Sequence, residues 1–204
     1  MTPTRTITER LLTGSAVADH LDALASLRLD IFEEYPYLYR GRREDELAYL
    51  AGYAGKPGAC VILAEDHGVV IGAATGMPLA REDALLRDPF AASPYPLDNL
   101  YYVGELLFRP AYRSGGLGQR LLARMESHIR DLGGFRQIVC ATVERPTDHP
   151  LRPADFIPID RFLSRTGFAR LDGIVTHFAW LEVDGVKRDH TMQFWVKDCA
   201  GSGN

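Results

Sequence analysis

The chain has 204 residues, of which 46% are hydrophobic and 25% are charged, the balance of an ordinary globular protein. This length suits one domain over residues 1–204 that needs neither disulfides nor a structural metal to stabilise its core. The formal net charge of −4 argues against a nucleic-acid partner, and the lack of any run of 18 apolar residues argues against a membrane partner.

Hydrophobic periodicity and β-rich runs predict a mixed α/β fold. In chain order, we expect a strand at 4–8, helices at 16–32 and 44–53, a strand hairpin from 60–64 and 69–75, a short helix at 81–87, a strand at 101–108, a helix at 117–132, a strand at 137–143, a helix at 155–165 and strands at 173–183 and 191–196. In the C-terminal half strands alternate with helices, an order that is typical of helices packed on a sheet.

Cysteine usage indicates a reducing compartment. Cys60, Cys140 and Cys199 are odd in number and widely spaced, so they form neither a CxxC pair nor a zinc pattern. Cys60 and Cys140 lie in apolar runs and are expected to be buried thiols. The polar N-terminus has no apolar leader segment. These features together predict a cytoplasmic protein without a metal site.

A glycine-rich turn between a predicted strand and a predicted helix is the most informative segment. It reads Leu107-Phe108-Arg109-Pro110-Ala111-Tyr112-Arg113-Ser114-Gly115-Gly116-Leu117-Gly118-Gln119-Arg120. Glycines let backbone N–H groups approach a ligand without a Cβ in the way, and a helix N-terminus adds a positive dipole, so the turn suits a phosphate. It has neither the Lys of a Walker A loop nor the third Gly of a dinucleotide fingerprint. On the glycines alone, a tight turn without any ligand is an equal alternative.

The turn resembles the signature of the GNAT superfamily of acetyl-CoA-dependent N-acetyltransferases. That signature, Arg/Gln-x-x-Gly-x-Gly/Ala, stands here as Arg113-Ser114-Gly115-Gly116-Leu117-Gly118. A predicted short helix that ends in Gly167-Phe168 is also similar, as is the order of elements, and the loops at 34–39 and 148–153 resemble a bacterial branch of the family. The resemblance implies a central, mostly antiparallel twisted sheet of six to seven strands, splayed at the fourth strand and flanked by helices.

Acetyl-CoA is the cosubstrate that the resemblance implies. In the family, backbone N–H groups of the turn bind the CoA pyrophosphate, which here points to Arg113, Ser114, Gly115, Gly116, Leu117, Gly118 and Gln119. The backbone of the preceding strand pairs with pantetheine, which here points to Leu106, Leu107 and Phe108. One N–H in that strand polarises the thioester carbonyl, and losing such a donor costs about 2.7–4 kcal/mol.

Acetylation of an amine requires a route for its proton, because an alkylammonium with a pKa of about 10 is only about one part in a thousand neutral at pH 7. Glu105 is the first candidate base, since it is the one charge inside the apolar run 101–108. The alternative is a structural Glu on the opposite strand face, paired with an Arg. His149 is the second catalytic candidate, against a plain loop histidine.

The general acid of many family members is absent. They carry a Tyr four residues before the Gly of the Gly-Phe pair, where this chain has Leu163. Either His149 or Asp160 substitutes for it, or the thiolate leaves without an acid, because a thiol pKa of about 8.5 makes it a fair leaving group.

The acceptor site is expected under the loop that follows the first helix. Carboxylates and aromatic rings there suit a cation, and the candidate substrate residues are Glu34, Tyr35, Tyr37 and Tyr39. The following Arg40, Arg42 and Arg43 would instead favour an anion, and a solvated charge run over packed tyrosines is the structural alternative. Closed, Pro-rich loops favour a small molecule over a protein tail.

Three functions therefore stay open. The first is an N-acetyltransferase that acts on a primary amine of a small molecule by direct attack in a ternary complex. The second is a non-catalytic acyl-CoA binding or sensing module, which the Leu163 position allows. The third is an acetyltransferase for protein Lys side chains or N-termini. Exposed edge strands and Trp195 permit a homodimer.

Overall fold

One seven-stranded sheet organises the computed structural model, which describes residues 6–113 and 115–199. The strand order is β1-β2-β3-β4-β5-β7-β6. The strands are β1 (Ile7–Thr13), β2 (Cys60–Asp66), β3 (Val69–Pro78), β4 (Leu100–Phe108), β5 (Gln137–Val143), β6 (Ala169–Leu181) and β7 (Lys187–Asp198). All neighbouring pairs are antiparallel except β4 and β5, which are parallel. The expected mixed α/β fold with a mostly antiparallel sheet is confirmed.

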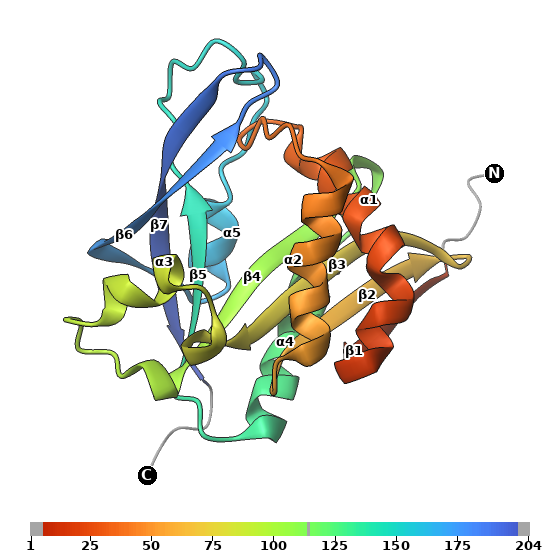
Figure 1. Cartoon of the computed structure of the whole chain (residues 1–204), viewed down its shortest axis with the longest axis vertical. Helices are drawn as coiled ribbons and strands as arrows, with labels where there is room; N and C mark the ends of the chain where they lie inside the picture. The colour runs from red at the N-terminus through yellow and green to blue at the C-terminus, as the bar shows by residue number, and fades with distance from the viewer. Residues whose placement is uncertain (1–5, 114, 200–204) are drawn as a thin grey trace.

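Helices cover both faces of the sheet (Figure 1). They are α1 (Leu21–Phe32), α2 (Arg43–Gly55), α3 (Ala84–Arg87), α4 (Leu117–Leu132) and α5 (Asp160–Arg165). Strand alternation decides which core each residue joins. On β2, Val61 and Leu63 pack with α1 and α2, whereas Cys60 and Ile62 pack with α4. None of these helices, within 6–113 and 115–199, has the length and apolar character needed to span a bilayer.

The strands β4 and β5 diverge, and this divergence shapes the site (Figure 1). They pair only between Leu100–Tyr102 and Gln137–Val139, after which β4 stays with β3 alone. A β-bulge at Gly104 interrupts the pairing with β3, because Val103 lies opposite Gly76 while Glu105 lies opposite Thr75. Val103 therefore faces α4, whereas Leu107 packs with α1 and α2. The extra residue also turns Glu105 toward α1.

Several boundaries differ from the sequence-based expectations. The first strand is Ile7–Thr13 instead of 4–8, and the expected helix at 16–32 is a 3-10 helix, Gly14–His20, followed by α1. The last short helix begins only at Asp160, because the prolines upstream of it cannot donate backbone hydrogen bonds. Trp195, which together with exposed edge strands was expected to permit a homodimer, is buried and donates to the Thr142 hydroxyl at 2.9 Å.

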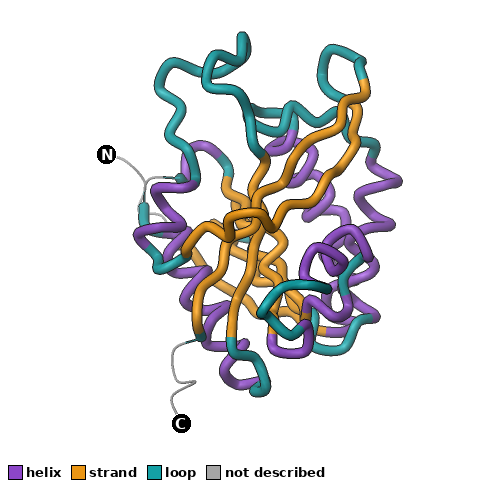
Figure 2. The backbone as a smooth tube through the Cα atoms, turned by 90° about the vertical axis from the view of Figure 1, so that its left-hand side faces the viewer, coloured by secondary structure: helices purple, strands orange, loops and turns teal. Residues whose placement is uncertain are grey.

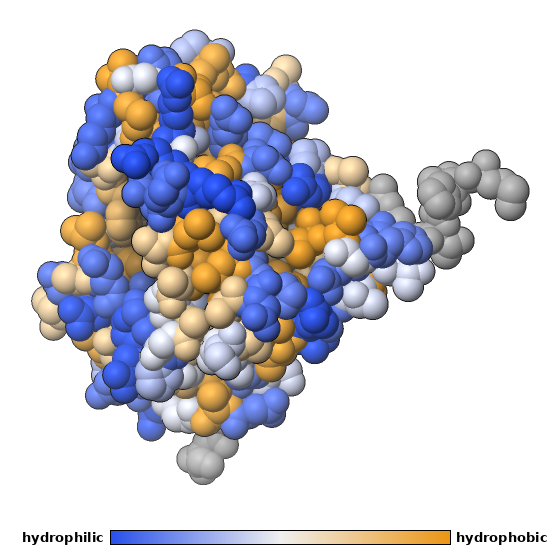
Figure 3. Space-filling model, turned by 45° about the vertical axis from the view of Figure 1, so that its right-hand side comes forward, coloured by the Kyte–Doolittle hydropathy of each residue, from blue (hydrophilic) through white to orange (hydrophobic). Residues whose placement is uncertain are grey.

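The hairpin of β6 and β7 and the loop 144–159 project at the same end of the molecule (Figures 1 and 2). The loop 33–42, between α1 and α2, reaches this end too. These three segments come from distant parts of the sequence. On the face that Figure 3 shows, hydrophobic patches are small and broken up by hydrophilic side chains.

Candidate active site

The glycine turn forms an open cradle at the N-terminus of α4. Gly116 has φ +72° and precedes the first helical residue, Leu117. A Cβ at Gly115 or Gly116 would meet no atom within 4 Å, so the space beside this turn is open. The first N–H groups of a helix have no acceptor inside it, which leaves those of Leu117, Gly118 and Gln119 for an anion. These residues lie together as expected, and Ser114 lies outside the described residues.

Gly118 has a packing role at the same turn. A Cβ there would lie 3.4 Å from the Phe162 ring and 3.5 Å from the Phe108 ring. Gly72 meets Phe108 from the other side, since its Cβ would lie 2.6 Å from Phe108 Cδ1. The end of β4 is thus clamped between β3, α4 and α5. The side chain of Leu117 is buried, so its contribution to a ligand is limited to its backbone.

Arg113 connects the cradle to two other predicted elements. Its Nε donates to the Phe108 carbonyl at 3.1 Å, and its Nη2 lies 2.7 Å from Glu34 Oε2. Both side chains are partly exposed. The candidate donor and acceptor residues therefore meet at this ion pair.

The backbone of Leu106, Leu107 and Phe108 lines the divergence of the two strands. One edge of this segment pairs with β3 at Ala74, Ala73 and Gly72. Within the described residues, pairing of the other edge with β5 stops at Tyr102. An unpaired strand edge presents N–H and C=O groups that an extended ligand can match like an added strand.

Glu105 lies at the start of this open edge and pairs with an arginine. It is 8% exposed and forms an ion pair with Arg28 of α1. Arg28 also pairs with Glu46 of α2, and its guanidinium lies 4.3 Å from the centre of the Tyr49 ring. Two buried carboxylates thus share one guanidinium. The alternative of an arginine partner for Glu105 is what the structure shows, and Glu105 Oε2 keeps no hydrogen-bond partner in the described part of the chain.

A tyrosine chain that the sequence analysis missed lies next to Glu105. The Tyr49 and Tyr53 hydroxyls are 3.1 Å apart, and the Tyr53 hydroxyl donates to Thr75 Oγ1 at 3.3 Å. Burial raises the pKa of Tyr53 well above its usual value. A Cβ at Gly104 would lie 3.0 Å from the Tyr53 hydroxyl, so any larger residue at the bulge would force its neighbours to shift. In the sequence, these hydrogen-bonded tyrosines were signalled by the i, i+4 spacing of Tyr49 and Tyr53 on a predicted helix.

His149 and Tyr35 meet where two loops cover the site. Their ring centres are 5.6 Å apart, and Tyr35 also packs edge-on against Phe156 at 4.7 Å. His149 Nδ1 accepts from the Leu151 N–H at 3.2 Å, which leaves Nε2 as the other ring nitrogen. The structure thus brings His149 to the acceptor loop. Asp160 begins α5 instead, which packs with α4 on the sheet face opposite Glu105.

Tyr37 and Tyr39 anchor the acceptor loop to β6. The Tyr37 carbonyl accepts from Arg145 Nη2 at 2.8 Å and from Trp180 Nε1 at 3.0 Å, and Tyr39 bridges to Glu182. Burial raises the pKa of Tyr37 to about 12. Burial and the neighbouring Glu46 raise the pKa of Tyr39 to about 12 as well. Both tyrosines therefore stay protonated, and we interpret them as structural residues of the acceptor loop.

Leu163 packs in the core between α4, α5 and the sheet. The position where many family members carry a tyrosine hydroxyl thus holds a buried apolar side chain.

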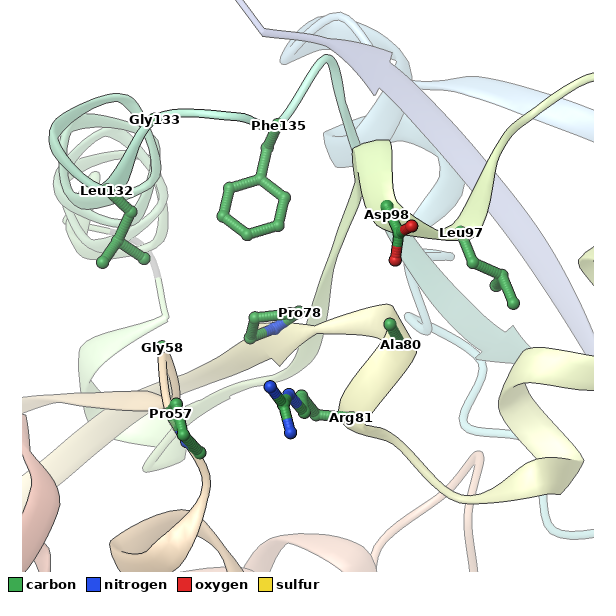
Figure 4. Close-up of a pocket in the computed structure, with 10 residues that line it drawn as sticks. All are labelled: Pro57, Gly58, Pro78, Ala80, Arg81, Leu97, Asp98, Leu132, Gly133 and Phe135. Atoms are coloured by element: carbon green, nitrogen blue, oxygen red, sulfur yellow. The ribbon is translucent and has the colours of Figure 1, made fainter.

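A separate hollow of about 550 Å³ lies at the far end of α4 from the glycine turn (Figure 4). It is lined by Pro57, Gly58, Pro78, Ala80, Arg81, Leu97, Asp98, Leu132, Gly133 and Phe135. Among the described residues, no group of His, Cys, Asp or Glu side chains is arranged to hold a metal ion.

Comparison with sequence families decides the classification. Residues 22–152 match the model of the acetyltransferase (GNAT) family. The chain belongs to the GNAT acetyltransferase family. This match covers most of the chain, including nearly all of α1, the bulged β4, the glycine turn and α4. No curated protein sequence matches the chain significantly.

Solved structures share the GNAT fold at low sequence identity. yncA from Salmonella typhimurium, described as an acetyltransferase with its cofactor acetyl-CoA, is 17% identical over 98% of this chain and 97% of its own, with a TM-score of 0.62. NAA60 from Arabidopsis thaliana, in complex with a bisubstrate analogue, is 18% identical over 97% and 100%, with a TM-score of 0.62. A ribosomal-protein-alanine N-acetyltransferase from Brucella melitensis is 18% identical over 94% and 99%, with a TM-score of 0.59. At these identities the likeness concerns the fold.

Proposed function

We propose that this GNAT protein transfers the acetyl group of acetyl-CoA to a primary amine of a small molecule, by direct attack in a ternary complex. One observation carries the proposal: the cradle at the α4 N-terminus and the unpaired edge of β4 lead directly to the buried Glu105. The cradle would bind an anion, the unpaired edge of β4 would bind an extended ligand, and the Glu105 carboxylate follows at the end of that edge.

Acetyl-CoA supplies the thioester whose acetyl group is transferred. The cradle fits its pyrophosphate, because the space beside Gly115 and Gly116 is open and helix N–H groups point there. The open backbone edge of Leu106–Phe108 fits the extended pantetheine arm, and an N–H of this edge would polarise the acetyl carbonyl.

Glu105 is the group that we assign to the amine's proton. Its Oε2 has no hydrogen-bond partner among the described residues, whereas Arg28 holds the other oxygen. Arg28 thereby orients the carboxylate and leaves one oxygen for the acceptor. His149, on the loop that covers the site, is the second group that could exchange a proton with the substrate. The buried Leu163 implies that the thiolate leaves without a tyrosine acid.

The loops around the site support a small acceptor. Arg40 N–H donates to the Leu181 carbonyl at 2.8 Å, and Val183 N–H donates to the Leu38 carbonyl at 2.9 Å. The acceptor loop is thus fixed to the β6–β7 hairpin by backbone hydrogen bonds on both sides. A closed cover of this kind leaves less room for a protein tail than for a small amine.

An assay of CoA release with acetyl-CoA and a panel of primary amines tests this function. We expect release that depends on the amine, together with the matching N-acetyl product. Acetyl-CoA binding without turnover of any amine would favour an acyl-CoA sensing module. Turnover of peptides alone would favour a protein acetyltransferase.

Location and assembly are further proposals. Burial of Cys60 and Cys140 as thiols supports a reducing, cytoplasmic setting. The edge strands β1 and β6 are the elements through which we would expect a homodimer to form.

A further inference from the structure

The Arg113 side chain covers part of the open edge of β4. Phe108 lies opposite Gly72 of β3, and the ladder hydrogen bond beside them joins the Arg109 N–H to the Ile71 carbonyl at 2.9 Å. In an antiparallel ladder this pattern turns the N–H and C=O of Phe108 away from β3, toward the open edge. Arg113 Nε donates to the Phe108 carbonyl at 3.1 Å, so it takes the place at which an extended ligand would donate.

The same guanidinium ties this edge to the acceptor loop. Its Nη2 lies 2.7 Å from Glu34 Oε2, and Glu34 lies in the loop 33–42 between α1 and α2. The Glu34 carbonyl accepts from the Leu38 N–H at 3.0 Å, so the ion pair acts on the turn that carries Tyr35 and Tyr37. Among the described residues no other cation pairs with Glu34, and its carboxylate therefore depends on Arg113 for a partner.

A neighbouring ion pair is built in nearly the same way but does not touch the open edge. Arg109 Nη1 lies 2.8 Å from Asp30 Oδ2. Arg109 comes four residues before Arg113 in the chain, and Asp30 likewise comes four residues before the partner of Arg113. The Nε of Arg109 donates to the Val70 carbonyl of β3 at 3.3 Å, so it leaves the Phe108 carbonyl alone. The two pairs therefore differ in whether they cover the donor's edge.

Acetyl-CoA would compete for Arg113 at two points. The extended pantetheine arm, which fits the open edge at Leu106–Phe108, needs the position that Arg113 Nε holds. The pyrophosphate would lie at the turn from which the Arg113 side chain extends, and phosphates bind arginine by charge-assisted hydrogen bonds. The side chains of Arg113 and Glu34 are 45% and 40% exposed, and ion pairs this exposed are weak enough to be exchanged.

We propose that Arg113 is a positioning residue that exchanges Glu34 for the pyrophosphate when acetyl-CoA binds. In the free protein it holds the acceptor loop against the end of β4 and covers the donor's edge. In the donor complex it turns to the phosphates, and the Glu34 carboxylate becomes free for the ammonium of an acceptor. The exchange depends only on acetyl-CoA binding, whereas the role of the freed carboxylate rests on the proposed acetyl transfer.

A double-mutant cycle, measured by calorimetry with acetyl-CoA and no amine, tests the exchange. Glu34→Gln removes the charge that Arg113 must leave, so the Kd of acetyl-CoA should fall by about 2–5-fold. In protein that carries Arg113→Gln, the same change at Glu34 should alter Kd by less than about 1.5-fold, because the pair is already gone. Asp30→Asn is the matched control and should leave Kd unchanged, since the pair that it breaks does not cover the open edge.

The cycle separates exchange from simple repulsion between Glu34 and the phosphates. An equal gain in affinity from Glu34→Gln with and without Arg113 would show repulsion alone and would overturn the exchange. No gain in the presence of Arg113, or the same gain from Asp30→Asn, would overturn it too. Because no amine is present, these results do not depend on whether the acetyl transfer is confirmed.

Steady-state kinetics test the freed carboxylate, with the primary amine that the wild-type protein acetylates fastest. Glu34→Gln should raise the KM of this amine about 5-fold or more while the Kd of acetyl-CoA falls, and a loss of folded structure would not move the two in opposite directions. An unchanged amine KM would remove Glu34 from the acceptor site and leave the exchange intact. If no amine is acetylated, the role of the freed carboxylate fails together with the proposed function, and the exchange is judged by calorimetry alone.

Discussion

At the scale of single residues, Glu105 combines burial with one carboxylate oxygen that lacks a hydrogen-bond partner in the described part of the chain. Glu105→Gln should lower kcat by about 10²–10⁴-fold, because the amide cannot take up the amine's proton. Acetyl-CoA affinity should stay the same, since the cradle is built from other residues. Steady-state kinetics and calorimetry check the two parts. Unchanged turnover would remove Glu105 from the mechanism.

Arg28 is the residue on which the buried charges depend. Arg28→Met leaves Glu46 and Glu105 buried without a cation, and removing one partner of a buried pair costs about 3–5 kcal/mol. Urea unfolding measures this loss. The control is Arg42→Met, because Arg42 pairs with Glu44 at 3.7 Å on the surface, where such pairs contribute about 0–1 kcal/mol. Similar losses in both variants would show that the buried pairs are not structural.

At the scale of elements, α4 offers two glycines with the same backbone conformation at its two ends. Gly116 and Gly133 both have φ +72°, and a Cβ at either would meet no atom within 4 Å. Valine at either position should therefore destabilise the fold to a similar extent. Gly116→Val alone should weaken acetyl-CoA binding, by about 10-fold or more, because its side chain enters the cradle. Equal affinities of the two variants in calorimetry would refute the cradle.

The bounds of helices and strands could be predicted from the sequence where a local pattern of residues determines them. The helix at 117–132 and the strand at 137–143 have the predicted bounds, because periodicity and Gly133 mark them. The bulge at Gly104 was not predictable, since it depends on the pairing of β4 with β3. That bulge decides which face Glu105 takes. Its partner Arg28 lies 77 residues earlier in the chain, so no local pattern could show the ion pair.

The acceptor side of the site was the least predictable part. The sequence analysis assigned the acceptor site to the loop that holds Tyr35, Tyr37 and Tyr39, and this assignment stays a prediction. It could not show that Arg145 and Trp180 hold the backbone of this loop, because these contacts join segments more than 100 residues apart.

At the scale of the whole molecule, buried thiols make stability depend on pH. Burial raises the pKa of Cys60 to about 11 and that of Cys140 to about 12, from an ordinary value of 9.0. Above pH 9 the unfolded chain releases these protons while the folded protein keeps them. The free energy of unfolding should therefore fall as pH rises from 9 to 11, by up to about 1.4 kcal/mol per pH unit for each thiol.

Urea unfolding at several pH values between 8 and 10.5 checks this dependence. Cys140→Ala removes one of the two thiols, so its stability should fall less steeply with pH than that of the wild-type protein. Lysines and other groups titrate in both proteins, and the difference between the two slopes isolates the thiol. Identical slopes would contradict the effect of burial.

The whole account depends on the path from the α4 cradle along β4 to Glu105. The most direct measurement is release of CoA from acetyl-CoA by the full chain with a panel of small primary amines, with mass spectrometry of the products. The account predicts release that requires the amine and yields its N-acetyl derivative in equal amount. Release no faster than without amine, across the panel, would contradict it.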